Sequence, residues 1–244
     1  MRIAVIADIH ANLEALESVM GRIAELTVND IVCLGDIVGY NANPNECIDI
    51  IRREKIVSVL GNHDVAASGR EAPNGFNALA QSAVFWTRKH LTPENRLFLL
   101  NLPPEARAGD FILVHGSIHD TNRYLLSRDA AADNFRLLAG LPGDLKLGFF
   151  GHTHIGMTFI DLQGSISSDH SSELLLSSGM HYLINPGSVG QPRDGDPRAS
   201  FLLYDSVDRT VRFFRVEYDI KRCQAKIVRA GLPPQLAWRL KHGQ

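Results

Sequence analysis

The chain has 244 residues, of which 45% are hydrophobic and 21% are charged, and its formal net charge is −2. This composition is typical of an ordinary globular protein and excludes a disordered or fibrous chain. The near-neutral charge argues against a basic face that would hold nucleic acid, so nucleic acid is not the expected partner.

No apolar stretch reaches the roughly 18 residues that a membrane span requires. A short apolar run at the N-terminus meets Asp8 and is too short for the hydrophobic region of a signal peptide. We therefore expect a cytoplasmic protein with no membrane partner. Cys33, Cys47 and Cys223 are odd in number and lack C-x-x-C spacing, which predicts neither a disulfide framework nor a thiolate zinc site.

Short apolar runs of strand length recur along the chain, and each stops at a glycine, aspartate or histidine. These runs cover residues 2–7, 31–34, 56–60, 111–114 and 147–150. Their continuous hydrophobicity predicts strands that are buried on both faces. Apolar residues at helical spacing predict a helix over 12–26, and a proline after Asn43 marks the start of a second helix. This alternation predicts right-handed crossovers in a parallel sheet.

Residues 65–106 break the alternation with two helical patterns, and we expect a helical, cap-like insert there. From residue 145 onward, short strands separated by turn signals predict a second sheet packed on the first. Residues 219–244 are predicted to form a C-terminal helical tail, interrupted by a glycine and two prolines. The expected organisation is a single domain over residues 1–244.

Polar clusters follow five of the predicted strands, and they contain five of the ten histidines. The clusters are Asp8-Ile9-His10, Gly35-Asp36, Gly61-Asn62-His63-Asp64, His115-Gly116 and Gly151-His152-Thr153-His154. Ligands of open α/β sheets bind at the carboxyl ends of the strands, so we expect these side chains to meet. Imidazole and carboxylate donors without a thiolate suit Mn²⁺, Fe²⁺ or Zn²⁺. The sequence therefore predicts a metal centre at this edge of the sheet.

The order of these clusters resembles the calcineurin-like metallophosphoesterase superfamily, whose pattern is D-x-H, G-D, G-N-H-[DE], H-G or G-H, and G-H-x-H. The match covers residues 3–205. The small bacterial and archaeal branch of this superfamily, which contains phosphodiesterase-like members, has sequence segments similar to residues 35–40, 44–47 and 185–190. The resemblance implies an α/β fold, a four-layer αββα sandwich of two mixed β-sheets flanked by helices.

The resemblance also implies two metal sites and their ligands. One site would use Asp8, His10, Asp36 and His154, and the other would use Asp36, Asn62, His115 and His152, with Asp36 bridging both. Two metals about 3.5 to 4 Å apart can hold a hydroxide between them and clamp a phosphoryl group during in-line attack. In this family pattern His63 is the candidate general acid, and Asp64 would orient it.

Several other residues have two interpretations at this stage. Asn12 is either the N-cap of the first helix or a group near the metals, and Asp64 is either an orienting group or a helix cap. Tyr40 and Phe76 either stack against a substrate ring or pack in the core. Arg193 either contacts a phosphate or lies in a solvated turn, and His119 follows His115 closely enough to reach the pocket.

The substrate class rests on an absence in the second motif. Protein phosphatases of this superfamily have an arginine just after that motif, where this chain has Ile37-Val38-Gly39-Tyr40. We therefore expect a Mn²⁺-stimulated hydrolase of a phosphodiester or of a nucleotide polyphosphate. The alternatives are a phosphomonoesterase or protein phosphatase, a scaffold that has the fold without the chemistry, and a metal-dependent nuclease, which would require a basic track.

Overall fold

A computed structural model describes residues 1–143 and 145–244. Its first sheet has the strand order β3-β2-β1-β11-β12-β9. The strands are β1 (Arg2–Ile6), β2 (Asp30–Cys33), β3 (Val57–Ser58), β9 (Glu173–Leu175), β11 (Ala199–Asp205) and β12 (Thr210–Val216). The strands β1, β2 and β3 are parallel, as the strand–helix alternation predicts. On the other side of β1, β11 is antiparallel.

The second sheet has the order β4-β5-β6-β10-β7-β8 and is also mixed. Its strands are β4 (Glu105–Ala108), β5 (Phe111–Val114), β6 (Leu147–Phe149), β7 (Gly156–Leu162), β8 (Ser165–Asp169) and β10 (His181–Pro186). The strands β5, β6 and β10 are parallel, and β4, β7 and β8 pair antiparallel. The parallel strands of both sheets therefore supply the carboxyl ends at which the polar clusters lie.

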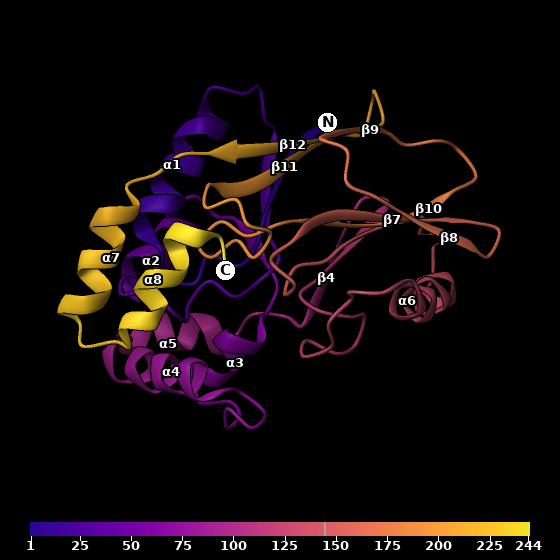
Figure 1. The fold of residues 1–244 in the computed structure, drawn as a ribbon. Coiled ribbons are helices and arrows are strands. Elements are labelled where there is room, and N and C mark those ends of the chain that lie inside the picture. The colour runs from indigo at the N-terminus through magenta and orange to yellow at the C-terminus, as the bar shows by residue number, and fades with distance from the viewer. Residues whose placement is uncertain (144) are drawn as a thin grey trace.

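Helices flank the two sheets. They are α1 (Leu13–Ala24), α2 (Pro44–Arg53), α3 (Asn62–Ser68), α4 (Ala78–His90), α5 (Pro93–Leu100), α6 (Arg128–Gly140), α7 (Ile220–Arg229) and α8 (Pro234–His242). The helices α1 and α2 pack on the first sheet and α6 packs on the second (Figure 1). Alternate residues of β1 show why the strands are apolar throughout: Ile3 and Val5 face the second sheet, whereas Ala4 and Ile6 face the helices. This arrangement confirms the αββα sandwich.

The division of strands between the sheets differs from the sequence prediction. We expected the strands after residue 145 to form the second sheet, but β9, β11 and β12 belong to the first sheet. Hydrophobic patterns predict that a strand is buried but not which strand it pairs with. The short elements β4, β8 and α3 and the longer helix α6 were also not predicted. Seven residues in α3 are too few to show a helical period, and β8 is largely polar.

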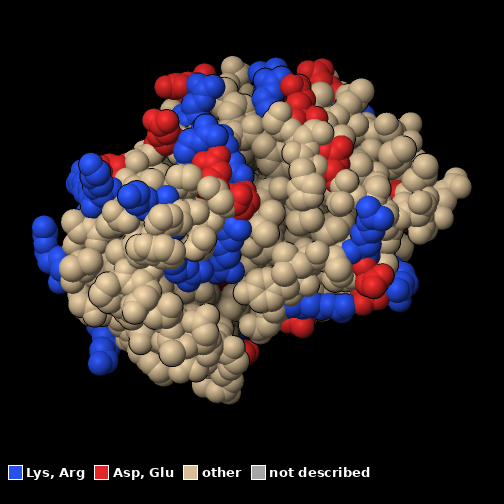
Figure 2. Space-filling model, in the orientation of Figure 1, with Lys and Arg blue, Asp and Glu red and all other residues tan. Residues whose placement is uncertain are grey.

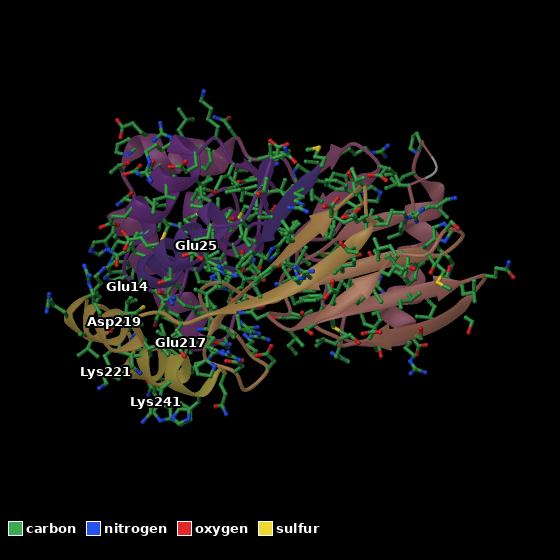
Figure 3. The ribbon with its side chains drawn as sticks, turned by 90° about the horizontal axis from the view of Figure 1, so that it is seen from above. Glu14, Glu25, Glu217, Asp219, Lys221 and Lys241 are labelled. Atoms are coloured by element: carbon green, nitrogen blue, oxygen red, sulfur yellow. The ribbon has the colours of Figure 1, made fainter. Side chains whose placement is uncertain are left out.

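The C-terminal tail packs against the N-terminal half of the molecule. Glu14 of α1 is buried and forms ion pairs with Lys226 and Arg222 of α7. Figure 3 shows Glu14 near Asp219, which caps the start of α7. A small apolar cluster joins α7 and α8 to Tyr40 and to α4, so the tail lies beside the polar clusters of the strand ends. Within the part of the chain that the structure describes, no helix is long and apolar enough to cross a membrane.

Candidate metal centre

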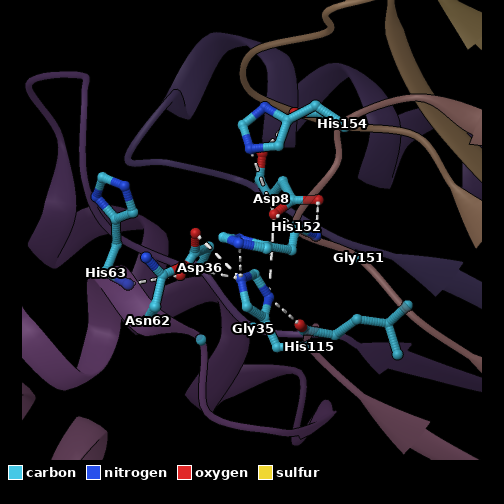
Figure 4. Close-up of polar contacts among 12 residues, drawn as sticks. Asp8, Gly35, Asp36, Asn62, His63, His115, Gly151, His152 and His154 are labelled. Carbon is cyan, nitrogen blue, oxygen red and sulfur yellow. Dashed lines mark hydrogen bonds and ion pairs between the residues drawn. The ribbon is translucent and has the colours of Figure 1, made fainter. Parts of the chain in front are cut away.

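Seven side chains from five separate segments meet at the carboxyl ends of the parallel strands (Figure 4). Asp8 and His10 follow β1, Asp36 follows β2, Asn62 begins α3, His115 follows β5, and His152 and His154 follow β6. All seven side chains are buried, with at most 8% of the surface of any of these residues exposed. Their donor atoms form two groups that share Asp36.

The first group consists of Asp8, His10, Asp36 and His154. The Nε2 atoms of His10 and His154 are 3.0 Å apart. Asp36 Oδ2 lies 3.5 Å from His10 Nε2, and Asp8 Oδ1 lies 3.5 Å from His154 Nε2. Two ring nitrogens and two carboxylate oxygens thus point at one another around a small volume.

The second group is centred on His115 Nε2. This atom lies 3.1 Å from Asn62 Oδ1, 3.2 Å from His152 Nδ1 and 3.3 Å from Asp36 Oδ2. Asp36 Oδ2 is therefore within 3.5 Å of a ring nitrogen in each group. A single carboxylate oxygen that faces two donor groups has the position of a bridging ligand.

Backbone carbonyls fix the orientation of three of the imidazole rings. His115 Nδ1 lies 2.8 Å from the Leu34 carbonyl, and His154 Nδ1 lies 2.6 Å from the Gln191 carbonyl. A carbonyl accepts only from a protonated ring nitrogen, so the proton of each neutral ring is held on this outer atom. His152 Nε2 is held in the same way by the Asn122 carbonyl at 3.2 Å. When a ring is neutral, its nitrogen that faces the centre therefore carries the lone pair, as in metal-binding histidines.

Asp36 Oδ2 is buried and has no hydrogen-bond partner among residues 1–143 and 145–244. Its other oxygen accepts a hydrogen bond from the His63 backbone N–H at 2.8 Å. An unpartnered buried carboxylate oxygen is costly, because nothing replaces the water that it loses on folding. A divalent cation would satisfy this oxygen and the surrounding lone pairs together. The donors therefore fit two metal ions that prefer nitrogen and oxygen ligands.

Backbone strain is concentrated at the same residues. Asp8, His10, Asp36, His152 and His154 all have φ values between +48° and +66°, in the left-handed region. Residues other than glycine rarely adopt this conformation, which costs on the order of 1 kcal/mol or more each. These turns fold back the chain directly after each strand and aim the side chains at a common point.

The pKa values show how strongly the buried groups act on one another. Burial would raise the pKa of Asp36, but His115 and His63 outweigh it and hold this pKa far below its usual range. Burial raises the pKa of Asp8 to about 7, although His115 opposes the shift. Burial would lower the pKa of His115, but Asp36 outweighs it and raises this pKa to about 9. Burial lowers the pKa of His10, which is therefore neutral at pH 7.

Comparison with known proteins identifies the family. A model of the calcineurin-like phosphoesterase superfamily domain matches residues 1–209 of this chain. The chain belongs to the calcineurin-like phosphoesterase superfamily. A metallophosphoesterase from Sphaerobacter thermophilus has 41% sequence identity and a TM-score of 0.87, and the match covers 100% of this chain and 99% of that one.

Two other relatives of this phosphoesterase-family chain are archaeal. An uncharacterized protein of Methanocaldococcus jannaschii is 42% identical over 99% of this chain and 98% of its own length. A hypothetical protein from Pyrococcus horikoshii has the same fold at 20% identity, with a TM-score of 0.82 and coverage of 100% and 98%. These similarities confirm the family and the small archaeal and bacterial type that the motifs indicate.

In this family member, a pocket of about 380 Å³ opens beside the candidate ligands. It is lined by Tyr40, Asn62, His63, Asn74, Gly75, Phe76, Asn77, Ala80, Asn122, Tyr124 and His152. A larger hollow of about 490 Å³ lies between α1 and α2, but none of the candidate ligands lines it. We therefore regard the smaller pocket as the candidate substrate site.

His63 and Asp64 have different environments. The His63 ring lines the pocket and lies against His10, Tyr40 and Phe76, with ring centroids 4.6 to 4.8 Å apart. Burial lowers the pKa of His63 to about 4. Both oxygens of Asp64 accept backbone N–H groups, from Gly61 and Val38, at 3.1 Å each. The structure thus favours the helix-cap interpretation of Asp64 and shows no hydrogen bond from it to the His63 ring.

Asn12 and His119 also lie away from the donor atoms. Asn12 Oδ1 accepts the Ala15 N–H at 3.2 Å and caps α1, while its amide donates to the Gly190 carbonyl at 2.9 Å. His119 is exposed over 57% of its side chain and pairs with Glu105 at 3.1 Å. The structure therefore supports the N-cap interpretation of Asn12, and it does not bring His119 into the pocket.

Tyr40 and Arg193, in contrast, lie at the centre. The Tyr40 ring is 4.5 Å from the His10 ring, and Arg193 Nη2 donates to Tyr40 Oη at 3.3 Å. The Arg193 backbone N–H donates to the His154 carbonyl at 3.2 Å. Both residues thus touch candidate ligands of the first group.

Supporting residues near the centre were missed in the sequence. Asn185 donates to the Gly151 carbonyl at 2.7 Å and to Thr153 Oγ1 at 2.9 Å, which holds the loop of His152 and His154. In the sequence, Asn185-Pro186-Gly187-Ser188 indicates only a similarity to the family and no role for its residues. In the structure, Ser188 Oγ also donates to the Asp8 carbonyl at 2.8 Å. The available sequence signal was Asn185 itself, a polar residue at the end of an apolar strand.

One tyrosine and one arginine near the centre lie in segments whose sequence does not indicate a role for them. Tyr124 stacks on the His152 ring with centroids 3.9 Å apart and is 46% exposed at the pocket. Arg239 of α8 lies over the Tyr40 ring, 5.4 Å from its centroid. Both residues stand in segments without a motif, so only the folded chain brings them to the centre.

Proposed function

We propose that this chain is a phosphoesterase that depends on two divalent metal ions, Mn²⁺, Fe²⁺ or Zn²⁺, and hydrolyses a phosphodiester or a nucleotide polyphosphate. The observation that carries the proposal is the position of Asp36 Oδ2. This buried oxygen accepts no hydrogen bond that meets normal geometry among the described residues, and it lies 3.3 and 3.5 Å from a ring nitrogen of each donor group. Such an arrangement suits a carboxylate that bridges two cations.

The proposed ligands divide as the family pattern implies. Asp8, His10, Asp36 and His154 would hold one ion, and Asp36, Asn62, His115 and His152 would hold the other. When bound, the two ions supply an activated water as nucleophile and neutralise charge on the phosphoryl oxygens. The strained turns and the carbonyl-fixed imidazole rings keep the donors in place before a metal arrives, which reduces the reorganisation that binding requires.

His63 is the proposed general acid. Its ring lines the pocket next to Asn62, close to where a leaving group would lie. Burial favours the neutral ring, but a phosphate in the pocket would bring negative charge near it and favour the protonated form. The proton on this ring can then pass to the departing oxygen as the phosphorus–oxygen bond breaks. Asp64 supports this step indirectly, by capping the helix that begins at Asn62.

The nature of the pocket supports a substrate with a ring or base. Tyr124 and Phe76 lie on the pocket wall, and a Tyr ring that is 46% exposed can stack on a planar group. The residues after the second motif, Ile37 and Val38, are fully buried and add no cation for a monoester dianion. These features favour a diester or a nucleotide polyphosphate over a simple phosphomonoester.

A substrate panel tests the proposal directly. The purified protein, loaded in turn with Mn²⁺, Fe²⁺, Zn²⁺ and Mg²⁺, would be assayed with an aryl phosphodiester, an aryl phosphomonoester and diadenosine tetraphosphate. We expect metal-dependent hydrolysis that is fastest with the diester or the tetraphosphate. Fastest turnover of the monoester would favour the phosphatase alternative. No hydrolysis of any compound with any metal would favour the scaffold alternative.

Two variants separate metal binding from proton transfer. The Asp36→Ala protein should lose both metal and activity, because it lacks the proposed bridge. The His63→Ala protein should retain its metal content while turnover falls by about 10²-fold or more, the usual contribution of a general acid. Equal loss of metal in the two variants would show that His63 is a ligand and not the acid.

A further inference from the structure

Two arginines from distant parts of the chain lie near the ring of Tyr40. Arg193 lies in the loop after β10, and Arg239 lies on α8. Their guanidinium carbons are 5.9 Å and 5.4 Å from the Tyr40 ring centroid. Figure 2 shows Lys and Arg side chains gathered on the surface where α8 ends.

Neither arginine forms an ion pair with an Asp or Glu side chain of the described residues. The acids in the loop of Arg193 are already engaged, since Asp194 pairs with Arg215 and Asp196 pairs with Arg198 at 2.6 Å. Arg193 donates to Tyr40 Oη and to Gln191 Oε1, both at 3.3 Å, and its buried Nε has no partner in the parts of the chain described here.

Arg239 likewise has no Asp or Glu partner among the described residues. Its Nε donates to the backbone oxygen of Gln244 at 3.0 Å, and its guanidinium group also hydrogen-bonds Tyr40. Burial lowers the pKa of Arg239, and Arg193 lowers it further. Both guanidinium groups are partly buried, lie near the same ring and have no Asp or Glu partner among the described residues, so an anion that both could reach would offset their repulsion.

The Tyr40 ring lies between the two arginines and the candidate metal ligand His10. Tyr40, on which both guanidinium groups rest, touches the rings of His10 and His63 with centroids 4.5 and 4.6 Å apart. The charge of Arg193 also acts on Asp8 and His154. An anion held by the two arginines would thus lie next to a phosphoryl group at the metals, but not at the same place.

Arg239 lies outside the part of the chain that the family model describes, which ends at residue 209. The tail is fixed by buried contacts: Leu236 and Leu240 of α8 belong to the apolar cluster that contains Tyr40. Trp86 Nε1 of α4 donates to the Ala230 carbonyl at 3.0 Å, which holds the turn between α7 and α8. The tail therefore adds a rigidly placed cation to the family's domain.

We infer that Arg193 and Arg239 form an anion subsite that binds a second, non-scissile phosphate of the substrate. This inference rests on the proposed function and narrows it, because a second phosphate next to the scissile one occurs in phosphoanhydrides. The favoured substrate class is then a nucleoside or dinucleoside polyphosphate, and a simple phosphodiester lacks the group that the subsite binds. The C-terminal tail takes part in substrate selection through Arg239.

The kinetic test compares two substrates in three variants. With Mn²⁺, kcat/KM would be measured for diadenosine tetraphosphate and for bis(p-nitrophenyl) phosphate, which has no second phosphate. We expect Arg239→Gln and Arg193→Gln to lower the kcat/KM for diadenosine tetraphosphate, relative to that for bis(p-nitrophenyl) phosphate, by about tenfold or more. This is the usual effect of one charge-assisted hydrogen bond. The matched control is Arg229→Gln on α7, an exposed residue of the same tail, which should leave the ratio unchanged.

A binding measurement tests the subsite without catalysis. Inorganic tripolyphosphate would be titrated into chelator-treated protein by calorimetry, and Arg239→Gln should weaken its binding by about tenfold, whereas Arg229→Gln should not. Arg239→Lys, which restores the charge but not the planar fork, should recover part of the affinity. Far-ultraviolet circular dichroism of each variant would show that the tail remains folded.

The outcomes separate the inference from the proposed function. A wild-type protein that hydrolyses neither substrate contradicts the proposed function, and the titration alone then decides on the subsite. An equal fall of both kcat/KM values in Arg239→Gln would place the arginine at the scissile phosphate and overturn the inference. Tripolyphosphate binding that is the same in wild type and in Arg239→Gln would overturn it as well.

Discussion

The Nε2 atoms of His10 and His154 lie 3.0 Å apart, although 144 positions separate the two residues in the chain. Burial lowers the pKa of both rings, so both are neutral at pH 7. His154 keeps its proton on Nδ1, which faces the Gln191 carbonyl. The lone pair of His154 Nε2 therefore points at His10 Nε2. A cation bound by both nitrogens would replace this close contact with two coordinate bonds.

This relationship predicts that the two metal sites can be lost one at a time. We expect His154→Ala and His152→Ala each to reduce the metal content from two ions to about one, because each residue belongs to one donor group only. Asp36→Ala should lose both. Mass spectrometry of the metals after gel filtration measures these ratios. Complete metal loss in all three variants would show a single cooperative site instead.

The protonation of the centre predicts proton release when metal binds. Below pH 7 both Asp8 (pKa about 7) and His115 (pKa about 9) hold a proton in the metal-free protein, and between pH 7 and 9 only His115 does so. A metal requires the deprotonated ligands, so its affinity should rise with pH by about tenfold per unit for each proton displaced. The slope should therefore be steeper below pH 7 and should vanish above pH 9.

Calorimetric titration of Mn²⁺ in buffers with different ionisation enthalpies counts these protons. We expect more than one proton released at pH 6 and about one at pH 8. A heat of binding that does not change with the buffer would contradict the assigned pKa values of Asp8 and His115.

Asn185 is predicted to hold the loop that carries two ligands. In Asn185→Ala, the Gly151 carbonyl and Thr153 Oγ1 lose a buried donor, and the Gly187 N–H loses an acceptor. Unpaired buried groups cost about 1 to 3 kcal/mol, so the free energy of unfolding in urea should fall by this amount and metal affinity should fall with it. Asn29→Ala, which removes one exposed hydrogen bond to the Arg2 N–H, should cost less than about 1 kcal/mol.

Gly61 is predicted to be irreplaceable because the Asp36 carboxylate lies against it. A Cβ atom at Gly61 would be 2.2 Å from both the Asp36 backbone nitrogen and Oδ1. We expect Gly61→Ala to displace Asp36, to abolish binding of the bridged metals and to destabilise the fold by about 1 to 3 kcal/mol.

Gly21 provides the contrasting case within α1. Nothing lies within 4 Å of a Cβ at this position, and alanine is favoured over glycine inside a helix. Gly21→Ala should therefore raise the free energy of unfolding by about 0.5 to 1 kcal/mol with full metal content. Equal behaviour of the two alanine variants would show that the approach of Gly61 to Asp36 is not restrictive.

The sequence by itself indicated the family, the buried strands and the residue types of the candidate centre. Each strand end carries its own polar cluster, and the residue types Asp, His and Asn define which metals they suit, so local patterns were sufficient. The sheet to which β11 and β12 belong was not predictable, because a buried strand has the same apolar pattern whichever neighbour it pairs with.

Only the tertiary structure decided how the clusters are completed. The contact of His10 with His154, the hydrogen bond of Asn185 to the Gly151 carbonyl and the return of Arg239 to Tyr40 join residues far apart in the chain. Side chains such as Arg239 stand in ordinary helical patterns, where nothing local distinguishes a solvated cation from one that lies over a buried aromatic ring. The sequence thus indicated the candidate ligands, and the fold defined what surrounds them.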